Sequence, residues 1–293
     1  MSVVLQDSDT LPDLPTEILL VIFGKIIPPA WEACPLKGYL PHPVFAPALT
    51  REQLISNYRQ QVADFGALAG ISRRFRELIN HLLYRTLAIF PSTDVGALRL
   101  SLEKYGDDAR SLVLDATMRD MPNGMSTLQR YRDLNACFSL MKSLRHLEVY
   151  GSHVLFMPEQ LRRSWLILHP TFPQFPVPEQ CWTGIETLVW RGLSSPCNDR
   201  QLIHALGKLG PTLKGARLED WNATPSVAAL LPSMAQLHDL SIVSGTVPLQ
   251  ILSAFIERTL DATGSTSLQK LTILQSSGLR PADLRGLLFR HNL

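Results

Sequence analysis

Five segments in the second half of the chain repeat one short pattern of apolar positions. In each segment, two apolar residues lie three positions apart and a third follows two positions later, with polar residues between them. The segments are residues 144–149, 185–190, 213–218, 237–242 and 268–273. They begin 24 to 41 residues apart, and the alternation at the end of each is typical of a strand with one buried face. The pattern predicts five short β-strands.

Helical patterns lie between these strands. Apolar residues at helical spacing follow Pro225, Pro248 and Pro281, and proline is favoured in the first turn of a helix. One strand and one helix per 20–30 residues is typical of a leucine-rich solenoid, whose stacked units share a core that no single unit can form. The fold class that we expect is therefore α/β, with strand–helix repeats and a parallel sheet. We take residues 91–293 as this domain, with a proline-rich loop inserted at about 152–182.

Earlier in the chain, two further strands and two further helices are expected before the five repeated segments. The strands are residues 87–90 and 111–114, and the helices are residues 95–105 and 128–141. Their apolar residues have the spacing that each element requires.

The first ninety residues carry a helical pattern. The run 18–23 is apolar on nearly every side of a helix, and Pro15 and Glu17 suit a first turn, so we expect a helix over 15–27. A second helix is expected to begin near Arg51. A third carries an amphipathic stripe of Phe75, Leu78, Ile79, Leu82 and Leu83. Six prolines in 28–49 predict an inserted loop, and the polar residues 1–10 predict a flexible tail.

Composition narrows the class of protein. The chain has 293 residues, of which 45% are hydrophobic and 18% charged, as in folded domains. A net charge of +2 with scattered Lys and Arg argues against nucleic acid, and the apolar run 18–23 is too short to cross a membrane. The four cysteines form no C-x-x-C pair, and the N-terminus has no basic signal segment. We therefore expect a protein of the cytoplasm or nucleus, or both.

Sequence motifs of common catalytic and metal sites are missing. There is no phosphate-binding glycine loop, no G-x-S-x-G and no H-E-x-x-H. The adjacent acids Asp107-Asp108 and Glu219-Asp220 do not converge on one site, and the histidines are scattered among the repeats. Trp190 and Trp221 are candidates for a ligand anchor or for core packing. We expect no enzyme activity, no cofactor and no metal.

Residues 11–90 resemble a fungal-type F-box. The similarity rests on L-P-T-E-I-L at 14–19 with V-I-F at 21–23, then I-S-R-R-F-R at 71–76 and L-L-Y-R-T-L at 82–87. The insertion at 28–49 departs from the spacing of that family. The later region resembles the irregular leucine-rich solenoids that often follow F-boxes. Regular repeats place Asn three positions after the third apolar residue, but this chain has Ser152, Leu193, Trp221, Gly245 and Ser276 there. No asparagine ladder can form.

The resemblance implies a substrate-recognition adaptor of an SCF-type cullin–RING ubiquitin ligase. The first helix would dock on a Skp-type adaptor, and the repeats would bind a protein substrate. The docking residues would be Leu14, Pro15, Ile18, Leu19, Ile22 and Phe23. The competing interpretation is that these residues only close an internal three-helix core.

The substrate would lie on the strand face, because residues between the apolar positions point away from the core. The candidates on this face are Tyr150, Arg191, Arg217, Glu219 and Lys270. Arg191 and Arg217 lie on neighbouring repeats and could grip one acidic segment together. A solvated sheet that binds nothing would have the same composition. The alternative function is a protein-interaction scaffold of the leucine-rich-repeat type, outside the ubiquitin system, with its first helices serving as an N-terminal cap.

Overall fold

The computed structural model divides into two compact units, residues Met1–Leu83 and Tyr84–Leu293, called here the N-terminal and C-terminal units. The structure describes residues 15–26, 51–90, 92–115, 127–150, 184–192, 196–260, 266–277, 279, 282 and 285–286. The expected tail at 1–10 and the expected insertions at 28–49 and 152–182 lie outside these residues.

The N-terminal unit contains three helices where the apolar patterns predicted them. They are α1 (Thr16–Ile26), α2 (Arg51–Ala69) and α3 (Arg73–Arg85). A small core joins them, formed by Leu19, Phe23, Phe65, Leu78 and Ile79. The ring of Phe23 meets that of Phe75 edge-on, with centroids 5.0 Å apart, a favourable arrangement of two aromatic rings. The unit therefore has a core of its own, made by side chains from all three helices.

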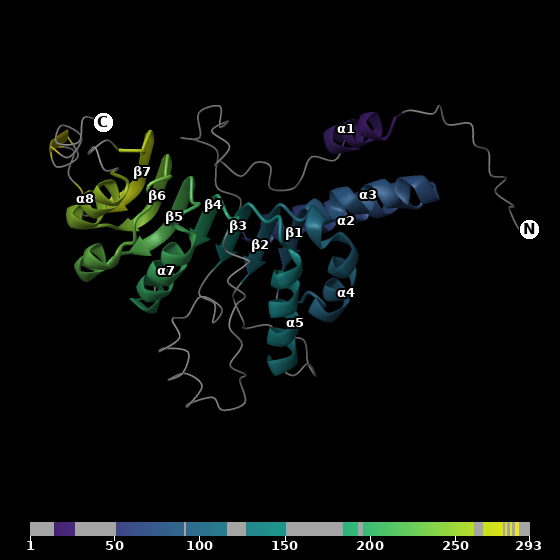
Figure 1. Cartoon of the computed structure of the whole chain (residues 1–293), viewed down its shortest axis with the longest axis horizontal. Coiled ribbons are helices and arrows are strands. Elements are labelled where there is room, and N and C mark those ends of the chain that lie inside the picture. The colour runs from purple at the N-terminus through teal and green to yellow at the C-terminus, as the bar shows by residue number, and fades with distance from the viewer. Residues whose placement is uncertain are drawn as a thin grey trace, which may run out of the picture. The chain divides into compact units, whose positions relative to one another are not determined.

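The C-terminal unit is built on a parallel sheet. In the described residues, seven strands lie side by side in chain order (Figure 1). They are β1 (Thr86–Ile89), β2 (Ser111–Asp115), β3 (His146–Tyr150), β4 (Thr187–Arg191), β5 (Gly215–Asn222), β6 (Asp239–Thr246) and β7 (Lys270–Ser277). The five repeated segments form β3 to β7, and the two earlier predicted strands form β1 and β2. The α/β class with a parallel sheet is confirmed.

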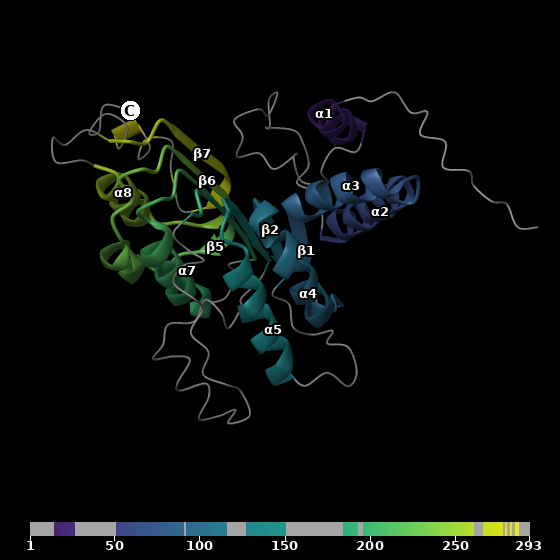
Figure 2. The same cartoon turned by 45° about the vertical axis from the view of Figure 1, so that its right-hand side comes forward.

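Helices cover one face of this sheet. The α-helices are α4 (Val95–Tyr105), α5 (Thr127–Leu140), α7 (Pro196–Leu209) and α8 (Leu249–Arg258), and two 3₁₀ turns are η2 (Gly106–Asp108) and η6 (Pro225–Leu230). Figure 2 shows the four α-helices on the same side of the sheet. The apolar pattern did not predict α7, and the segment after Thr224, where a helix was expected, is a 3₁₀ turn. Most of the helix expected after Pro281 lies outside the described residues.

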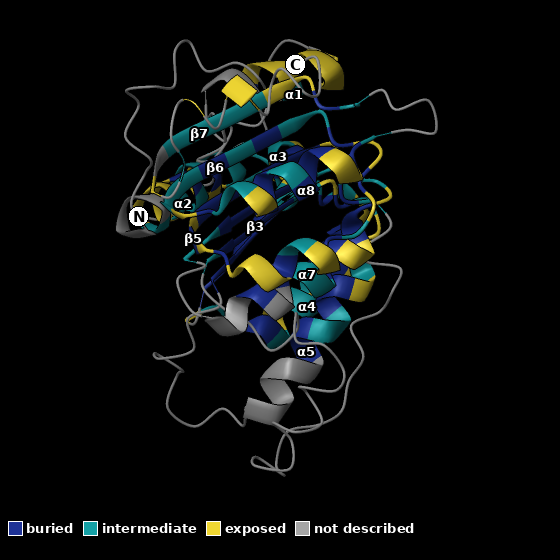
Figure 3. Ribbon diagram, turned by 90° about the vertical axis from the view of Figure 1, so that its left-hand side faces the viewer, coloured by how far each residue is buried: buried dark blue, intermediate teal, exposed yellow. Residues whose placement is uncertain are grey.

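The strand register aligns the repeated apolar positions into two rows. One row is Leu87, Leu112, Leu147, Leu188, Ala216, Leu240 and Leu271. The other is Ile89, Leu114, Val149, Trp190, Leu218, Ile242 and Ile273. These rows pack with the helices into one continuous core (Figure 3). A slip of one residue would turn a strand's apolar set to the opposite face, so burial fixes the register.

The turns before the strands are joined by a second set of hydrogen bonds. The residue preceding each strand donates its backbone N–H to the carbonyl of the equivalent residue one repeat earlier, as in Arg110 N to Arg85 O at 2.9 Å. Side chains add to these bonds: Arg110 Nη1 donates to Ser143 O at 3.4 Å, and His238 Nδ1 lies 3.0 Å from Ser267 O. Contacts between neighbouring strands therefore extend to the turns at their amino ends. They also form at the carboxyl ends, near the asparagine positions of regular repeats, where Thr246 N donates to Asn222 Oδ1 at 3.0 Å.

A buried carboxylate occupies the neighbourhood of one such asparagine position. Trp221 lies in the core and donates its indole N–H to Asp199 Oδ1 at 2.7 Å. The other oxygen, Oδ2, accepts from the backbone N–H of Thr224 at 3.1 Å and from its hydroxyl at 2.8 Å. Asp199 belongs to the first turn of α7, where a carboxylate is favourable. Trp221 therefore packs in the core and ties β5 to α7. Trp190 is also fully buried.

The Cys137 thiol provides a pH-dependent test of this core. Burial, with the nearby Asp133 carboxylate, raises the pKa of Cys137 to about 12, whereas an unfolded thiol titrates near 8.5. The stabilisation linked to the neutral thiol is complete below the unfolded value and falls as pH rises toward 12. We expect the wild type to lose about 2 kcal/mol relative to Cys137→Ala between pH 7.5 and pH 10. Urea unfolding at both pH values measures this difference. An equal loss in both proteins would contradict a neutral buried thiol.

Candidate partner-binding surfaces

The first helix separates the predicted docking residues into two groups. Leu19 and Phe23 are buried in the core of the N-terminal unit, whereas Ile18 is 47% exposed and Ile22 is 36% exposed. Pro15 is also exposed, and Leu14 lies outside the described residues. The two sides of this helix therefore differ in their environment. One side of α1 closes a three-helix core, and the other leaves aliphatic side chains in solvent.

The exposed side of α1 forms a contiguous apolar stripe. Ile18, Val21 and Ile22 have the spacing i, i+3 and i+4, which places them on one helical face. Val21 is 56% exposed and belongs to this surface, although it was not among the expected docking residues. It lies inside the same apolar run, so the run itself was the available signal. We call Ile18, Val21 and Ile22 the α1 stripe.

On the opposite side of the sheet from the helices, the second group of candidates meets across three strands. Arg191 Nε lies 2.8 Å from Glu148 Oε1, and Arg191 Nη1 lies 3.1 Å from Glu219 Oε2. Arg217 Nε contacts the second oxygen of Glu219, Oε1, at 2.6 Å. Tyr150 donates its hydroxyl to Glu148 Oε1 at 2.8 Å, and its ring lies 5.4 Å from the Arg191 guanidinium carbon. These five residues are the central ion-pair cluster.

The pairing of the strands explains why these side chains lie close together. Glu148 and Tyr150 belong to β3, Arg191 to β4, and Arg217 and Glu219 to β5. Because β4 pairs with β3 on one side and β5 on the other, Arg191 reaches a carboxylate on each neighbour. The sequence pattern placed all five residues on the strand face, and four of them, all but Glu148, were expected to contact the substrate. It did not identify their contacts with one another.

The charged groups of the cluster interact mainly with one another. Burial alone lowers the pKa of Arg191, but the carboxylates of Glu148 and Glu219 outweigh this effect and hold that pKa above its ordinary value. Burial and the Glu148 charge raise the pKa of Tyr150, so its hydroxyl stays protonated as a donor. Two guanidinium groups face two carboxylates, and their formal charges cancel. The cluster therefore has little charge left for an acidic partner.

The remaining strand-face candidate lies apart from the cluster. Lys270 begins β7, the last strand of the sheet, and its side chain is exposed. Its strand pairs only with β6 in the described sheet, which separates Lys270 from β4 by two strands. The structure therefore does not bring Lys270 to Arg191.

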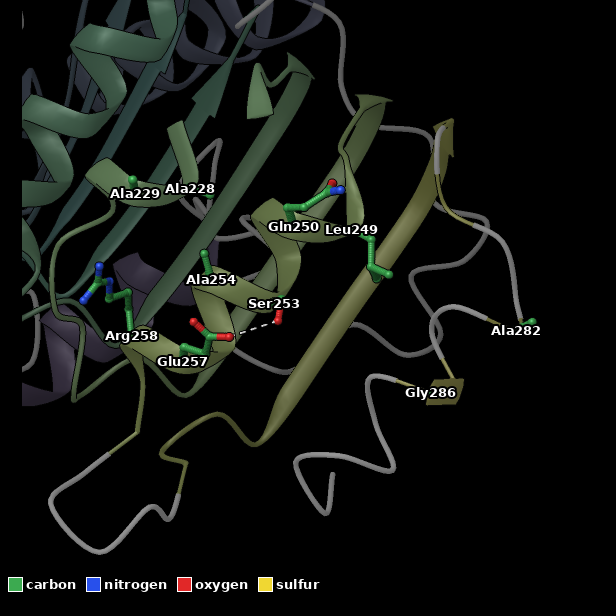
Figure 4. A pocket seen from close by; sticks show the side chains of 10 residues that line it. All are labelled: Ala228, Ala229, Leu249, Gln250, Ser253, Ala254, Glu257, Arg258, Ala282 and Gly286. Carbon is green, nitrogen blue, oxygen red and sulfur yellow. Dashed lines mark hydrogen bonds between the residues drawn. The ribbon is translucent and has the colours of Figure 1, made fainter. Parts of the chain in front are cut away.

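A shallow groove opens on the helix side of the C-terminal unit, between η6 and α8. It has a volume of about 610 Å³, and its walls carry small side chains such as Ala228 and Ala254 (Figure 4). Ser253 donates to Glu257 Oε1 at 3.2 Å across this surface, and Arg258 lies at the side. In the described residues there is no set of three or more metal-ligating side chains, and no described helix could span a membrane.

Comparisons of this sequence with known protein families and with curated proteins find no match. The geometry of the two units therefore carries the functional argument.

Proposed function

We propose that this chain is the substrate-recognition adaptor of an SCF-type cullin–RING ubiquitin ligase. The N-terminal unit docks on a Skp-type adaptor, and the C-terminal unit holds a protein substrate. Ubiquitin transfer is carried out by the partners, and this chain raises the effective concentration of the substrate near them. The observation that carries the proposal is the α1 stripe, because aliphatic side chains grouped on one exposed helix face are typical of a partner surface.

The core of the N-terminal unit supports docking over a role as a cap. Leu19 and Phe23 already anchor α1 to α2 and α3, so the stripe is not needed to hold the three helices together. The three-helix pattern also agrees with the F-box resemblance of residues 11–90.

The repeat architecture supports the substrate-binding half of the proposal. In the described residues, seven parallel strands lie side by side, and their strand-face side chains come from segments far apart in the sequence. On β6 and β7 these side chains reach the surface, as at Ser241, Lys270 and Thr272, whereas Val113, Glu148 and Val189 on β2 to β4 are buried. Such a face can present many combinations of side chains while the core rows stay apolar. The central ion-pair cluster ties β3, β4 and β5 together on this face, and exposed side chains such as Lys270 remain for polar and specific protein recognition.

The test is co-purification with a Skp-type adaptor. We expect Ile18→Asp/Ile22→Asp to lower adaptor affinity at least about a hundredfold, because a buried interface does not tolerate two unpaired carboxylates. Both side chains are exposed in the free chain, so the melting temperature should change little. Phe23 is unsuitable for this test because it belongs to the core, and its replacement would unfold the unit.

The matched control is Leu100→Asp/Leu230→Asp, which places the same two charges on exposed leucines of the C-terminal unit. This variant should bind the adaptor as the wild type does. Full adaptor binding by the α1 variant would refute docking through the stripe. Failure of the folded wild type to bind any Skp-type adaptor would leave the chain as a repeat scaffold outside the ubiquitin system.

A further inference from the structure

A row of charged side chains follows the amino ends of the strands. Each member of the row is the residue that comes directly before a strand. From β1 to β7 these residues are Arg85, Arg110, Arg145, Glu186, Lys214, His238 and Gln269. We call this the amino-end row. Backbone hydrogen bonds of 2.7–2.9 Å link each member to the next, so the row is continuous across the sheet. None of the seven side chains is buried.

The charges of this row are poorly compensated. Four members are Arg or Lys and one is a carboxylate, which gives a formal charge of +3 with neutral His238. Glu186 is shared: its Oε1 lies 3.1 Å from Arg145 Nη1, and its Oε2 lies 3.2 Å from Lys214 Nζ. These pairs are exposed, so solvent and salt weaken them. The amino-end row therefore differs from the central ion-pair cluster, where every charge has a partner and the charged side chains are at most 13% exposed.

The first two arginines of the row have no acid partner among the described residues. Arg110 donates to two backbone carbonyls, those of Asp107 at 2.8 Å and Ser143 at 3.4 Å. These bonds hold the side chain in place, but a neutral carbonyl does not cancel its charge. Arg85 is exposed and makes no ion pair within the described part of the chain.

We infer that the amino-end row is a binding surface for the acidic face of a protein helix. Neighbouring strands lie about 4.8 Å apart, which sets the spacing of successive row members. Carboxylates at i, i+4 and i+7 of a helix have Cβ atoms about 5–6 Å apart and match this spacing. An extended peptide presents same-face side chains about 6.8 Å apart, a poorer match. The inference depends only on the C-terminal unit, and it stands whether or not the N-terminal unit docks on a Skp-type adaptor.

A structural role for the same row makes a different prediction. Basic side chains near helix C-termini stabilise the helix dipole. Here α3 ends at Arg85, and α4, α5 and α7 end shortly before Arg110, Arg145 and Lys214. If that were their only role, removing two charges would lower the melting temperature and leave no binding to lose. A binding surface instead requires a ligand whose affinity depends on those charges.

The experiment uses the full chain and two synthetic peptides. One is an alanine-based helix with Glu at i, i+4 and i+7, and its twin carries Gln at the same positions. Fluorescence anisotropy at low salt should detect binding of the Glu peptide to the wild type, with no binding of the Gln twin. We expect Arg85→Gln/Arg145→Gln to weaken the Glu peptide about tenfold, as two lost exposed ion pairs imply.

Arg59→Gln/Arg73→Gln is the matched control, because it removes the same charge from exposed helix positions of the N-terminal unit. It should bind the Glu peptide as the wild type does. If both variants bind the Glu peptide equally weakly, the loss of affinity reports only the net charge of the protein, which would overturn the inference. A wild type that binds neither peptide, or that binds a short DNA duplex more tightly than the Glu peptide, would also overturn it.

Discussion

Replacing Arg191 with alanine is expected to lower the free energy of unfolding by about 3–5 kcal/mol, because two carboxylates then lose their shared partner in a buried setting. The Arg191 side chain is only 13% exposed, and that of Glu148 only 7%. Glu219 retains Arg217, but Glu148 keeps only the hydroxyl of Tyr150. Urea unfolding of the full chain measures the loss, and circular dichroism confirms that the variant is folded before denaturation.

The matched control for this substitution is Lys214→Ala. Lys214 also pairs with a glutamate, Glu186, at 3.2 Å, but its side chain is 49% exposed. The expected loss is below about 1 kcal/mol, the usual value for a surface ion pair. Adding Glu148→Gln to Arg191→Ala should recover part of the stability by removing the orphaned charge. A loss for Arg191→Ala no larger than for Lys214→Ala would show that solvent screens the cluster.

A second large effect is expected at Gly245. Its φ of +142° lies in a region that L side chains rarely adopt. A Cβ at this position would stand 2.4 Å from the carbonyl oxygen of Trp221 and 2.8 Å from its nitrogen, both backbone atoms of the adjacent strand β5. Neither can move without breaking the β5–β6 ladder and shifting the buried Trp221. We therefore expect Gly245→Ala to cost about 3 kcal/mol or more.

Gly207 offers the opposite case within the same unit. It lies in α7, and a Cβ there would meet no atom within 4 Å. Alanine is a better helix former than glycine, so Gly207→Ala should raise stability by about 0.5–1 kcal/mol. Thermal melts of both variants against the wild type check the pair. Similar effects in the two variants would contradict the close approach of β6 to β5.

Variants of the central ion-pair cluster are poor tools for identifying a substrate. Charge reversal at Arg191 or Arg217 removes a buried partner, so lost binding in such a variant would partly report lost folding. Exposed positions such as the α1 stripe and the amino-end row allow binding to be changed while the core remains intact. The strand face is better probed with variants on β7, where Lys270 is exposed.

The sequence by itself determined the sheet and its buried rows. A strand alternates its side chains between two faces, so the recurring apolar positions of residues 144–149 and its four counterparts specify both the strands and the side that enters the core. The helical spacing of apolar residues likewise predicted α2, α3 and α4. It did not place α7, although Pro196 opens that helix and Leu202, Leu206 and Leu209 face the core.

Only the tertiary structure decided which residues are free to bind. The run 18–23 is apolar on nearly every side, so its pattern favours no face, and the packing of Leu19 and Phe23 against α2 and α3 left Ile18 and Ile22 in solvent. On the sheet, alternation showed that Arg191 points away from the core. Its partners come from strands 43 and 28 residues away in sequence, and no local periodicity records the charge that a neighbouring strand will supply.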